Sequence, residues 1–247
     1  YKMAAELGNI SAMNSYATML RKGDGIPINK EEAAKYFKMS ADLGDSYAMN
    51  TYGIMLSEGD GINVNKKEAA KYFKISADNG NTYGMFNYGI MLREGDGIEV
   101  KKKEAAYYFK RAADLGDADA MNSYGVMLRD GDGIQMNKSE AAKYFKISAD
   151  EGNPYAMYNI GRMLKKGDGV EIDKKEAAYY LKQSANGGNV FAMNSYAQML
   201  YIGDGVELNK KEAARYYKMA ADLGNDKAMN HYGHLLRDGD GVTMNKK

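Results

Sequence analysis

The sequence predicts an all-α fold, an array of helical hairpins, and three observations predict it. The triplet Gly-Asp-Gly recurs every 36 residues, starting at positions 23, 59, 95, 131, 167, 203 and 239. Each 36-residue unit contains two stretches in which apolar residues have helical spacing. Residues that start and stop helices border both stretches. A fixed period of about 20 to 50 residues is typical of stacked repeat proteins.

The first helix of each unit is represented by Ser46 to Glu58 in the second unit. Asp45 precedes it and is a candidate N-cap, because its carboxylate can accept a hydrogen bond from a backbone N–H of the first turn. Gly59 follows it and can adopt the left-handed conformation that ends helices. Its apolar or small residues have the spacing of an amphipathic helix; they are Ala48, Met49, Tyr52, Gly53, Met55 and Leu56.

The second helix begins after the loop Gly59 to Val64. Asn65 is followed three residues later by Glu68, which is a capping-box pattern with asparagine in place of serine or threonine. The helix is expected to run to Asn79 and to end at Gly80. Its packing residues are Ala69, Ala70, Tyr72, Phe73, Ile75 and Ala77. Each unit is therefore expected to be a helical hairpin.

Small residues recur where two helices of the array are expected to approach closely. A glycine in mid-helix costs about 1 kcal/mol relative to alanine, so close packing is the expected compensation. The first helices carry Gly53, Gly89, Gly125, Gly161 and Gly233 at this position, with Ala17 and Ala197 in the other two units. The second helices carry a pair of alanines, such as Ala69 and Ala70, in every unit. We therefore expect neighbouring units to share one continuous core.

Composition and charge exclude several classes of function. The chain is 45% hydrophobic and 27% charged, and it has no apolar run of the roughly 18 residues that span a membrane. Its net charge of +1 lacks the excess of lysine and arginine expected of a nucleic-acid-binding protein. We expect neither a membrane nor a nucleic acid as partner. The chain has no cysteine, which excludes disulfides and favours a reducing compartment, the cytoplasm, without fixing it.

The array is expected to occupy residues 1–247 as a single domain of about six and a half units. Residues 1–8 match only the second half of a later unit, and Met244 to Lys247 repeat Val64 to Lys67, the start of a second helix. We therefore expect the chain to be a segment of a longer protein, truncated at both ends. Incomplete units at the ends are also expected to allow end-to-end self-association.

The repeated unit resembles the Sel-1-like repeat, a relative of the tetratricopeptide repeat. The resemblance rests on Ala48 to Leu56, on the turn Gly59-Asp60-Gly61-Ile62, and on the second helix from Lys67 to Gly80, and it covers the whole chain. It implies a right-handed α-α superhelix whose concave side is lined by the first helices. It also implies an adaptor that assembles protein complexes.

Positions that vary between units are candidates for recognition, because the stacking residues must recur. The position of Asn50 is occupied by Asn14, Asn50, Phe86, Asn122, Tyr158, Asn194 and Asn230. The position of Ile54 is occupied by Thr18, Ile54, Ile90, Val126, Arg162, Gln198 and His234. The predicted partner-binding residues are the whole first series together with Arg162, Gln198 and His234. The last two positions of the first helix vary most, from Arg21-Lys22 through Lys165-Lys166 to Tyr201-Ile202.

The asparagines have two interpretations. An amide can donate to and accept from a peptide backbone, so one asparagine per unit could hold an extended segment of a partner. Phe86 and Tyr158 would then be aromatic anchors. Alternatively, the asparagines bond to a neighbouring helix and hold the stack together, and the two aromatic residues are local repacking.

We predict a non-catalytic scaffold that binds a protein or peptide in its concave groove, and no cofactor. A regulatory or targeting region of a larger enzyme, such as a kinase, is the alternative. A glycan-binding groove that uses Tyr158, Tyr201 and Phe191 is a third hypothesis. His231 and His234 are three residues apart on a helix but lack an evident third metal ligand. The aspartate of Gly-Asp-Gly is interpreted as a turn residue, because calcium needs a denser set of oxygen ligands.

Overall fold

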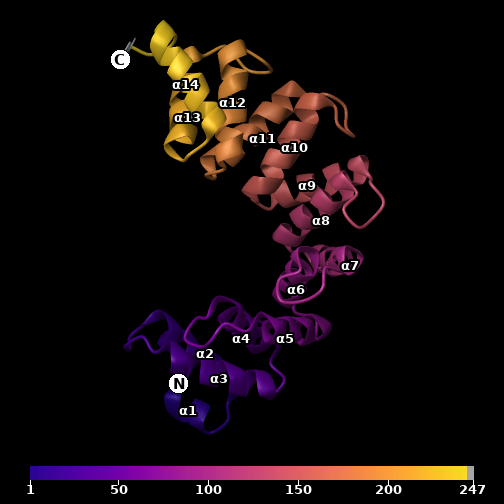
Figure 1. Cartoon of the computed structure of the whole chain (residues 1–247), viewed down its shortest axis with the longest axis vertical. Coiled ribbons are helices and arrows are strands. Elements are labelled where there is room, and N and C mark those ends of the chain that lie inside the picture. Colours follow the sequence, from indigo (N-terminus) through magenta and orange to yellow (C-terminus); the bar gives the residue numbers. More distant parts are fainter. Residues whose placement is uncertain (244–247) are drawn as a thin grey trace. The chain divides into compact units, whose positions relative to one another are not determined.

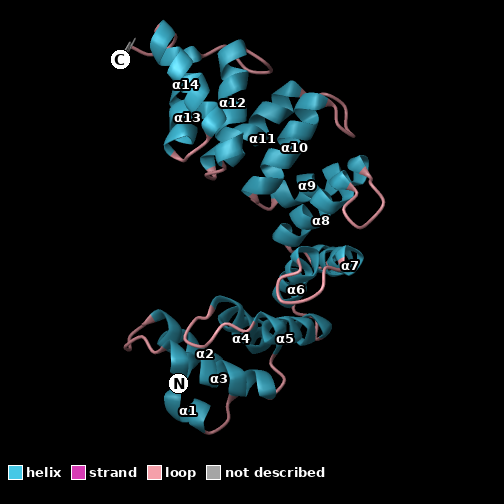
Figure 2. Cartoon of the chain, viewed as in Figure 1, coloured by secondary structure: helices cyan, strands magenta, loops and turns pink. Residues whose placement is uncertain are grey.

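The computed structural model describes residues 1–243, and Figures 1 and 2 show helices joined by loops. Within these residues there are fourteen helices and no strand. Two compact bodies make up the chain, residues 1–120 and residues 121–247, and the second is described as far as residue 243. The predicted fold class, all-α with 36-residue helical hairpins, is confirmed. The predicted start of a further helix at residues 244–247 lies outside the described residues.

Two kinds of helix alternate along the chain. The first helices of the hairpins are α2 (Ile10–Lys22), α4 (Ser46–Glu58), α6 (Thr82–Glu94), α8 (Ala118–Asp130), α10 (Pro154–Lys166), α12 (Val190–Ile202) and α14 (Asp226–Asp238). The second helices are α3 (Lys30–Asp42), α5 (Lys66–Asp78), α7 (Lys102–Asp114), α9 (Lys138–Asp150), α11 (Lys174–Asn186) and α13 (Lys210–Asp222), and α1 (Lys2–Glu6) precedes the first hairpin. The predicted first helix, Ser46 to Glu58, matches α4 residue for residue. The predicted second helix ends one residue later than α5 does.

Side-chain caps start the second helices other than α7, with one difference from the expected capping box. Oδ1 of Asn65 accepts a hydrogen bond from the backbone N–H of Glu68 at 3.1 Å. The Glu68 carboxylate accepts from Nδ2 of Asn65 at 2.9 Å. In the usual capping box it accepts from the backbone N–H of the cap residue. Here that N–H already donates to the carbonyl oxygen of Leu56 at 2.8 Å, which ties the start of α5 to the end of α4.

Close contact inside the hairpins explains the mid-helix glycines other than Gly233, where an added Cβ would meet no atom within 4 Å. A Cβ added to Gly53 would lie 2.8 Å from the ring of Phe73, which is buried between α4 and α5. The same contact recurs between Gly89 and Phe109 and between Gly125 and Phe145. Edge-to-face tyrosine pairs join the two helices of five hairpins at ring distances of about 5 Å; they are Tyr16 with Tyr36, Tyr52 with Tyr72, Tyr88 with Tyr108, Tyr124 with Tyr144, and Tyr196 with Tyr216. The expected close packing is confirmed.

The Gly-Asp-Gly turns of five units contact the preceding unit, which their interpretation as simple turns did not include. Nζ of Lys66, at the start of α5, lies 2.6 Å from Oδ1 of Asp96 in the next unit. A Cβ added to Gly97 would lie 2.5 Å from Cβ of the same lysine. Equivalent lysine–aspartate pairs are Lys30 with Asp60, Lys138 with Asp168, Lys174 with Asp204, and Lys210 with Asp240, at 2.7 to 2.9 Å. We call this contact the inter-unit joint.

Tyrosines of the second helices form further links between units. The hydroxyl of Tyr108 donates to Oδ1 of Asp78 at 3.1 Å, and that of Tyr180 donates to Oδ1 of Asp150 at 3.0 Å. Burial, and then the hydrogen bond to the carboxylate, raises the pKa of both tyrosines above the ordinary value of 10.0. Burial also raises the pKa of Tyr217 to about 12.

These tyrosines predict a loss of stability at alkaline pH. An unfolded tyrosine ionises near pH 10.0, whereas the folded one stays neutral to a higher pH. The unfolded state therefore binds fewer protons above about pH 10, and the free energy of unfolding falls as pH rises through the folded pKa values. Circular dichroism melts between about pH 8 and pH 12 should show this fall, and Tyr108→Phe should reduce it. Tyrosinate absorbance that is complete near pH 10 in protein that is still folded would contradict the prediction.

Candidate functional site

Three asparagines of the variable series bond to the neighbouring unit. Oδ1 of Asn50, which is 5% exposed, accepts a hydrogen bond from Nδ2 of Asn87 at 2.8 Å. Oδ1 of Asn122 accepts from Nδ2 of Asn159 at 2.9 Å. Nδ2 of Asn14 donates to Oδ1 of Asp45, the N-cap of α4, at 3.0 Å. In each case an amide on one first helix is tied to the following unit.

Three other predicted residues lie on α6 and α14. Phe86 is half-buried, and its ring packs against that of Phe109 at 5.8 Å. Asn230 and His234 are exposed on α14. The second histidine of that helix, His231, places its ring 4.9 Å from Tyr217.

The remaining four predicted residues, Tyr158, Arg162, Asn194 and Gln198, line one groove in the second body. The first two come from α10 and the last two from α12. The groove has a volume of about 880 Å³. Its other lining residues are Lys165, Lys166, Leu181, Val190, Phe191, Ser195, Leu223, Gly224, Asn225, Asp226 and Lys227, so the groove crosses α10, α12 and the start of α14. We call it the α10–α14 groove.

Asn194 differs from the bonded asparagines. Its Oδ1 is buried and has no hydrogen-bond partner; Oδ1 of Asn14 has none either, but Nδ2 of Asn14 bonds to Asp45. Oδ1 of Asn50 and Oδ1 of Asn122 each accept a hydrogen bond from an asparagine one residue further along the next first helix. The corresponding residue for Asn194 is His231, which stacks on a tyrosine ring. Oδ1 of Asn194 is therefore not bonded to the following unit, whereas Oδ1 of Asn50 and Oδ1 of Asn122 are.

Aromatic side chains form one side of the groove. The rings of Tyr158 and Phe191 are 6.1 Å apart, and Phe191 is 62% exposed. The guanidinium of Arg162 lies 5.4 Å from the centre of the Tyr158 ring, a cation–π contact. Phe191 was considered in the sequence only as a glycan-stacking residue. This position varies along the array as Ser11, Tyr47, Tyr83, Asp119, Tyr155, Phe191 and Lys227, and that variation is the signal that could have found Phe191.

Two lysines at the end of α10 make the groove basic. Nζ of Lys165 donates to Oε1 of Gln198 at 3.2 Å, and Lys166 is exposed. Burial lowers the pKa of Lys165 below its ordinary value; attraction to Asp204 opposes this shift, and repulsion from Lys166 adds to it. The sequence showed that these positions vary, but it gave no reason to place them in the site.

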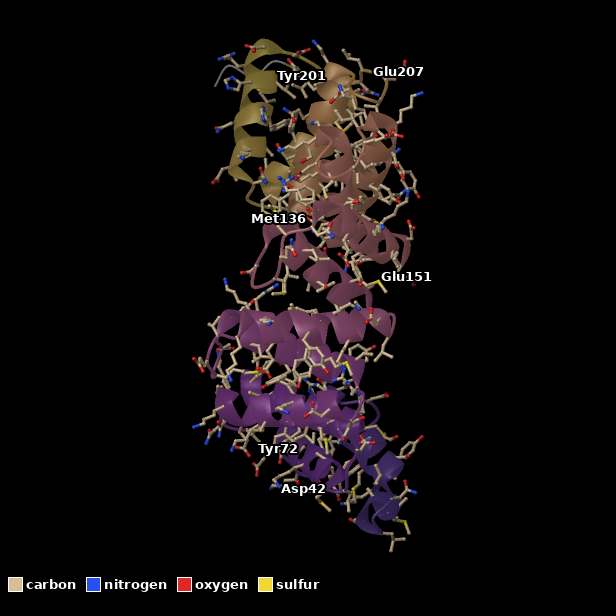
Figure 3. All side chains as sticks on the ribbon, turned by 90° about the vertical axis from the view of Figure 1, so that its right-hand side faces the viewer. Asp42, Tyr72, Met136, Glu151, Tyr201 and Glu207 are labelled. Carbon is tan, nitrogen blue, oxygen red and sulfur yellow. The ribbon has the colours of Figure 1, made fainter. Side chains whose placement is uncertain are left out.

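Tyr201, labelled in Figure 3 near the end of α12, lies outside the groove. Its hydroxyl donates to Oδ2 of Asp240 at 3.0 Å, and Nζ of Lys210 lies 5.4 Å from the centre of its ring. The structure therefore separates Tyr201 from Tyr158 and Phe191, with which the glycan hypothesis grouped it.

Residues 1–243 offer neither a cluster of metal ligands nor a candidate membrane-spanning helix. No group of three or more histidine, aspartate or glutamate side chains could hold a metal ion in this part of the chain. None of its helices is both long and apolar enough to cross a bilayer.

The family comparison matches every unit of the array. The model of the Sel1 repeat matches residues 10–45, 46–81, 82–117, 118–153, 154–189, 190–225 and 226–246. The chain belongs to the Sel1 repeat family. Sel1 repeats generally mediate protein–protein interaction and are typical non-catalytic scaffolds. A search of curated protein sequences found no significant match.

Solved structures of Sel1 repeat proteins share the fold. A protective antigen of uropathogenic Escherichia coli with an SLR fold is 26% identical with a TM-score of 0.90; the match covers 99% of this chain and 52% of the antigen. This chain thus spans about half the length of that relative. A Sel1 repeat protein from Oxalobacter formigenes is 28% identical with a TM-score of 0.82, over 88% of this chain and 89% of that one.

A third structure shows likeness of fold alone. An immunity protein from Pseudomonas aeruginosa is 18% identical with a TM-score of 0.52, and the match covers 87% of this chain and 81% of that one.

Proposed function

We propose that this chain is a non-catalytic adaptor that holds a segment of a partner protein in the α10–α14 groove. The observation that supports this most is the convergence of Tyr158, Arg162, Asn194 and Gln198 on one groove. The unit-to-unit asparagine bonds support a stacking role for the equivalent residues Asn50 and Asn122. The proposal therefore reduces the predicted site to the part of the variable series that lines the groove.

The groove has the size and the chemistry for a short extended segment. Its volume of about 880 Å³ falls in the usual range for ligand sites, roughly 300–1,000 Å³. Gln198 and Ser195 supply polar contacts, and Tyr158 with Phe191 supplies an aromatic surface of the kind that is enriched at binding hot spots.

A peptide-display selection tests this proposal. Random twelve-residue peptides are selected on the wild-type chain and then measured against a groove variant, Tyr158→Asn with Phe191→Ser. Both replacements are residues that other units carry at the same positions, Asn122 and Ser11, so the fold should be kept. Tyr179→Lys is the matched control, because Tyr179 is exposed on a second helix and the equivalent residue is Lys143.

We expect the selected peptides to bind the groove variant about tenfold more weakly than the wild type or the control, because the aromatic surface is lost. Circular dichroism of all three proteins checks that the helices are intact. Peptides that bind the groove variant and the wild type equally, or a selection that enriches no peptide, would overturn the proposed site.

A further inference from the structure

We propose that the α10–α14 groove selects an acidic segment, with an apolar side chain three or four residues away from a pair of carboxylates. This inference rests on the proposed function and names the chemistry of the partner. Two features of the groove carry it: positive charges without ion-pair partners at one end, and an apolar surface at the other.

The end of α10 departs from the charge pattern of three other first helices; α2 also ends in two cations, Arg21 and Lys22, but there Arg21 lies 2.6 Å from Asp60. In α6, α8 and α14 the last two residues are an arginine and an acid that pair with each other; these are Arg93 with Glu94 at 3.0 Å, Arg129 with Asp130 at 2.7 Å, and Arg237 with Asp238 at 2.7 Å. In α10 the same two positions are Lys165 and Lys166, and Arg162 lies one turn earlier. The acid that would neutralise this end of the helix is replaced by a second cation.

The two aspartates that follow α10 and α12 are already paired with other residues, whereas Asp226 at the start of α14 is a further acid that lines the groove. The aspartates that follow α10 and α12, Asp168 and Asp204, lie 2.7 Å from Lys138 and Lys174 in the inter-unit joints. Within residues 1–243, none of Arg162, Lys165 and Lys166 forms an ion pair. The three positive charges are therefore free to attract a carboxylate from a partner, and Lys165, being half-buried, is partly shielded from water.

The opposite end of the groove is apolar. Phe191 is 62% exposed and Leu223 is 59% exposed, and Val190 and Leu181 line the surface beside them. Exposed apolar side chains gathered in a groove are typical of a docking surface for an apolar residue of a partner.

The length of α10 sets the spacing of the two features. Tyr158 and Lys166 are eight residues apart, which at a rise of about 1.5 Å per residue is about 12 Å. An extended peptide advances about 3.3 Å per residue and crosses this distance in three or four residues. A leucine placed against Phe191 would thus bring carboxylates three or four residues away to the three cations.

Fluorescence anisotropy with defined peptides tests the inference. One labelled peptide carries a leucine, three small polar residues and two glutamates; a second has both glutamates replaced by glutamine; a third lacks the spacer. The charge-restored variant, Arg162→Val with Lys165→Arg and Lys166→Asp, copies the residues of α8 at these positions. The control, Lys175→Glu with Lys182→Gln, lowers the net charge by the same three units on exposed positions of α11.

We expect the acidic peptide to bind the wild type and the control within about twofold of each other, and the charge-restored variant at least about tenfold more weakly. The glutamine peptide and the peptide without the spacer should both lose about tenfold on the wild type. Binding of the acidic peptide should weaken steeply with added salt, because the ion pairs lie near the surface.

Two other results would overturn this inference without contradicting the proposed function, and a third would contradict the proposed function itself. If display-selected peptides need the groove residues but bind the charge-restored variant equally well, the groove binds proteins without selecting acids. If heparin or vesicles containing phosphatidylserine displace the acidic peptide at equal charge concentration, the cations bind polyanions in general. If no selected peptide needs the groove residues, the proposed function itself fails.

Discussion

Replacing Gly97 by alanine is expected to lower the free energy of unfolding by about 2–5 kcal/mol. Gly97 has a φ of +78°, a left-handed conformation that costs an alanine about 1–2 kcal/mol. The added Cβ would also lie 2.5 Å from Cβ and 2.8 Å from the carbonyl carbon of Lys66. Relieving this overlap must shift the start of α5 and disturb the ion pair between Lys66 and Asp96, a typical overpacking cost of about 1–3 kcal/mol.

Gly80→Ala is the matched control for this prediction. Gly80 has a φ of +87°, but a Cβ added there meets no atom within 4 Å. Its cost should be limited to the backbone term of about 1–2 kcal/mol. Urea unfolding followed by circular dichroism gives both values. Equal losses in the two variants would mean that the inter-unit joint tolerates the extra methyl group and that only the backbone conformation matters.

Replacing Phe109 by alanine is expected to cost about 3–5 kcal/mol. This side chain is 0% exposed, and its ring lies against the backbone of Gly89 and the ring of Phe86. Removing it leaves a cavity that two helices facing each other cannot readily close. Phe109→Leu should cost less than about 1.5 kcal/mol, because it keeps most of the volume and Leu181 occupies the same position in another hairpin.

The neighbouring Tyr107 provides the control for the Phe109 variants. It is 56% exposed, and Lys71 and Lys143 occupy the equivalent positions in other units. Tyr107→Lys should change the free energy of unfolding by no more than about 0.5 kcal/mol. Urea unfolding of the three variants under one set of conditions makes the comparison. A loss for Phe109→Ala as small as that for Tyr107→Lys would show that the ring is not a packing element of the hairpin.

Local features of the sequence predicted the hairpin closely. Asp45 and Asn65 accept hydrogen bonds from the first turns of α4 and α5, as their positions before the apolar stretches indicated. Gly59 has a φ of +75° and ends α4 where expected. These assignments succeeded because a cap and a left-handed glycine act within a few residues of where they occur in the chain.

The candidate site was predicted less well, because it depends on contacts between units. Asn50 and Asn194 have similar neighbours in sequence, a methionine before and a hydroxyl residue after, yet only Asn50 accepts a hydrogen bond from an asparagine of the next first helix. That difference is set by the residue 37 positions later, Asn87 for one and His231 for the other. The variable series therefore includes two kinds of residue: those that bond to the next unit and those that line the groove.

The sequence by itself determined the period, the family, the two helices of each hairpin and their caps, because these follow from local spacing and backbone preference. The tertiary structure alone decided that the aspartate of Gly-Asp-Gly pairs with a lysine of the preceding unit, and that Lys165, Lys166 and Phe191 join Tyr158 and Asn194 in one groove. The physical reason is that charge pairing and groove lining depend on which side chains neighbouring helices bring within a few ångströms of one another.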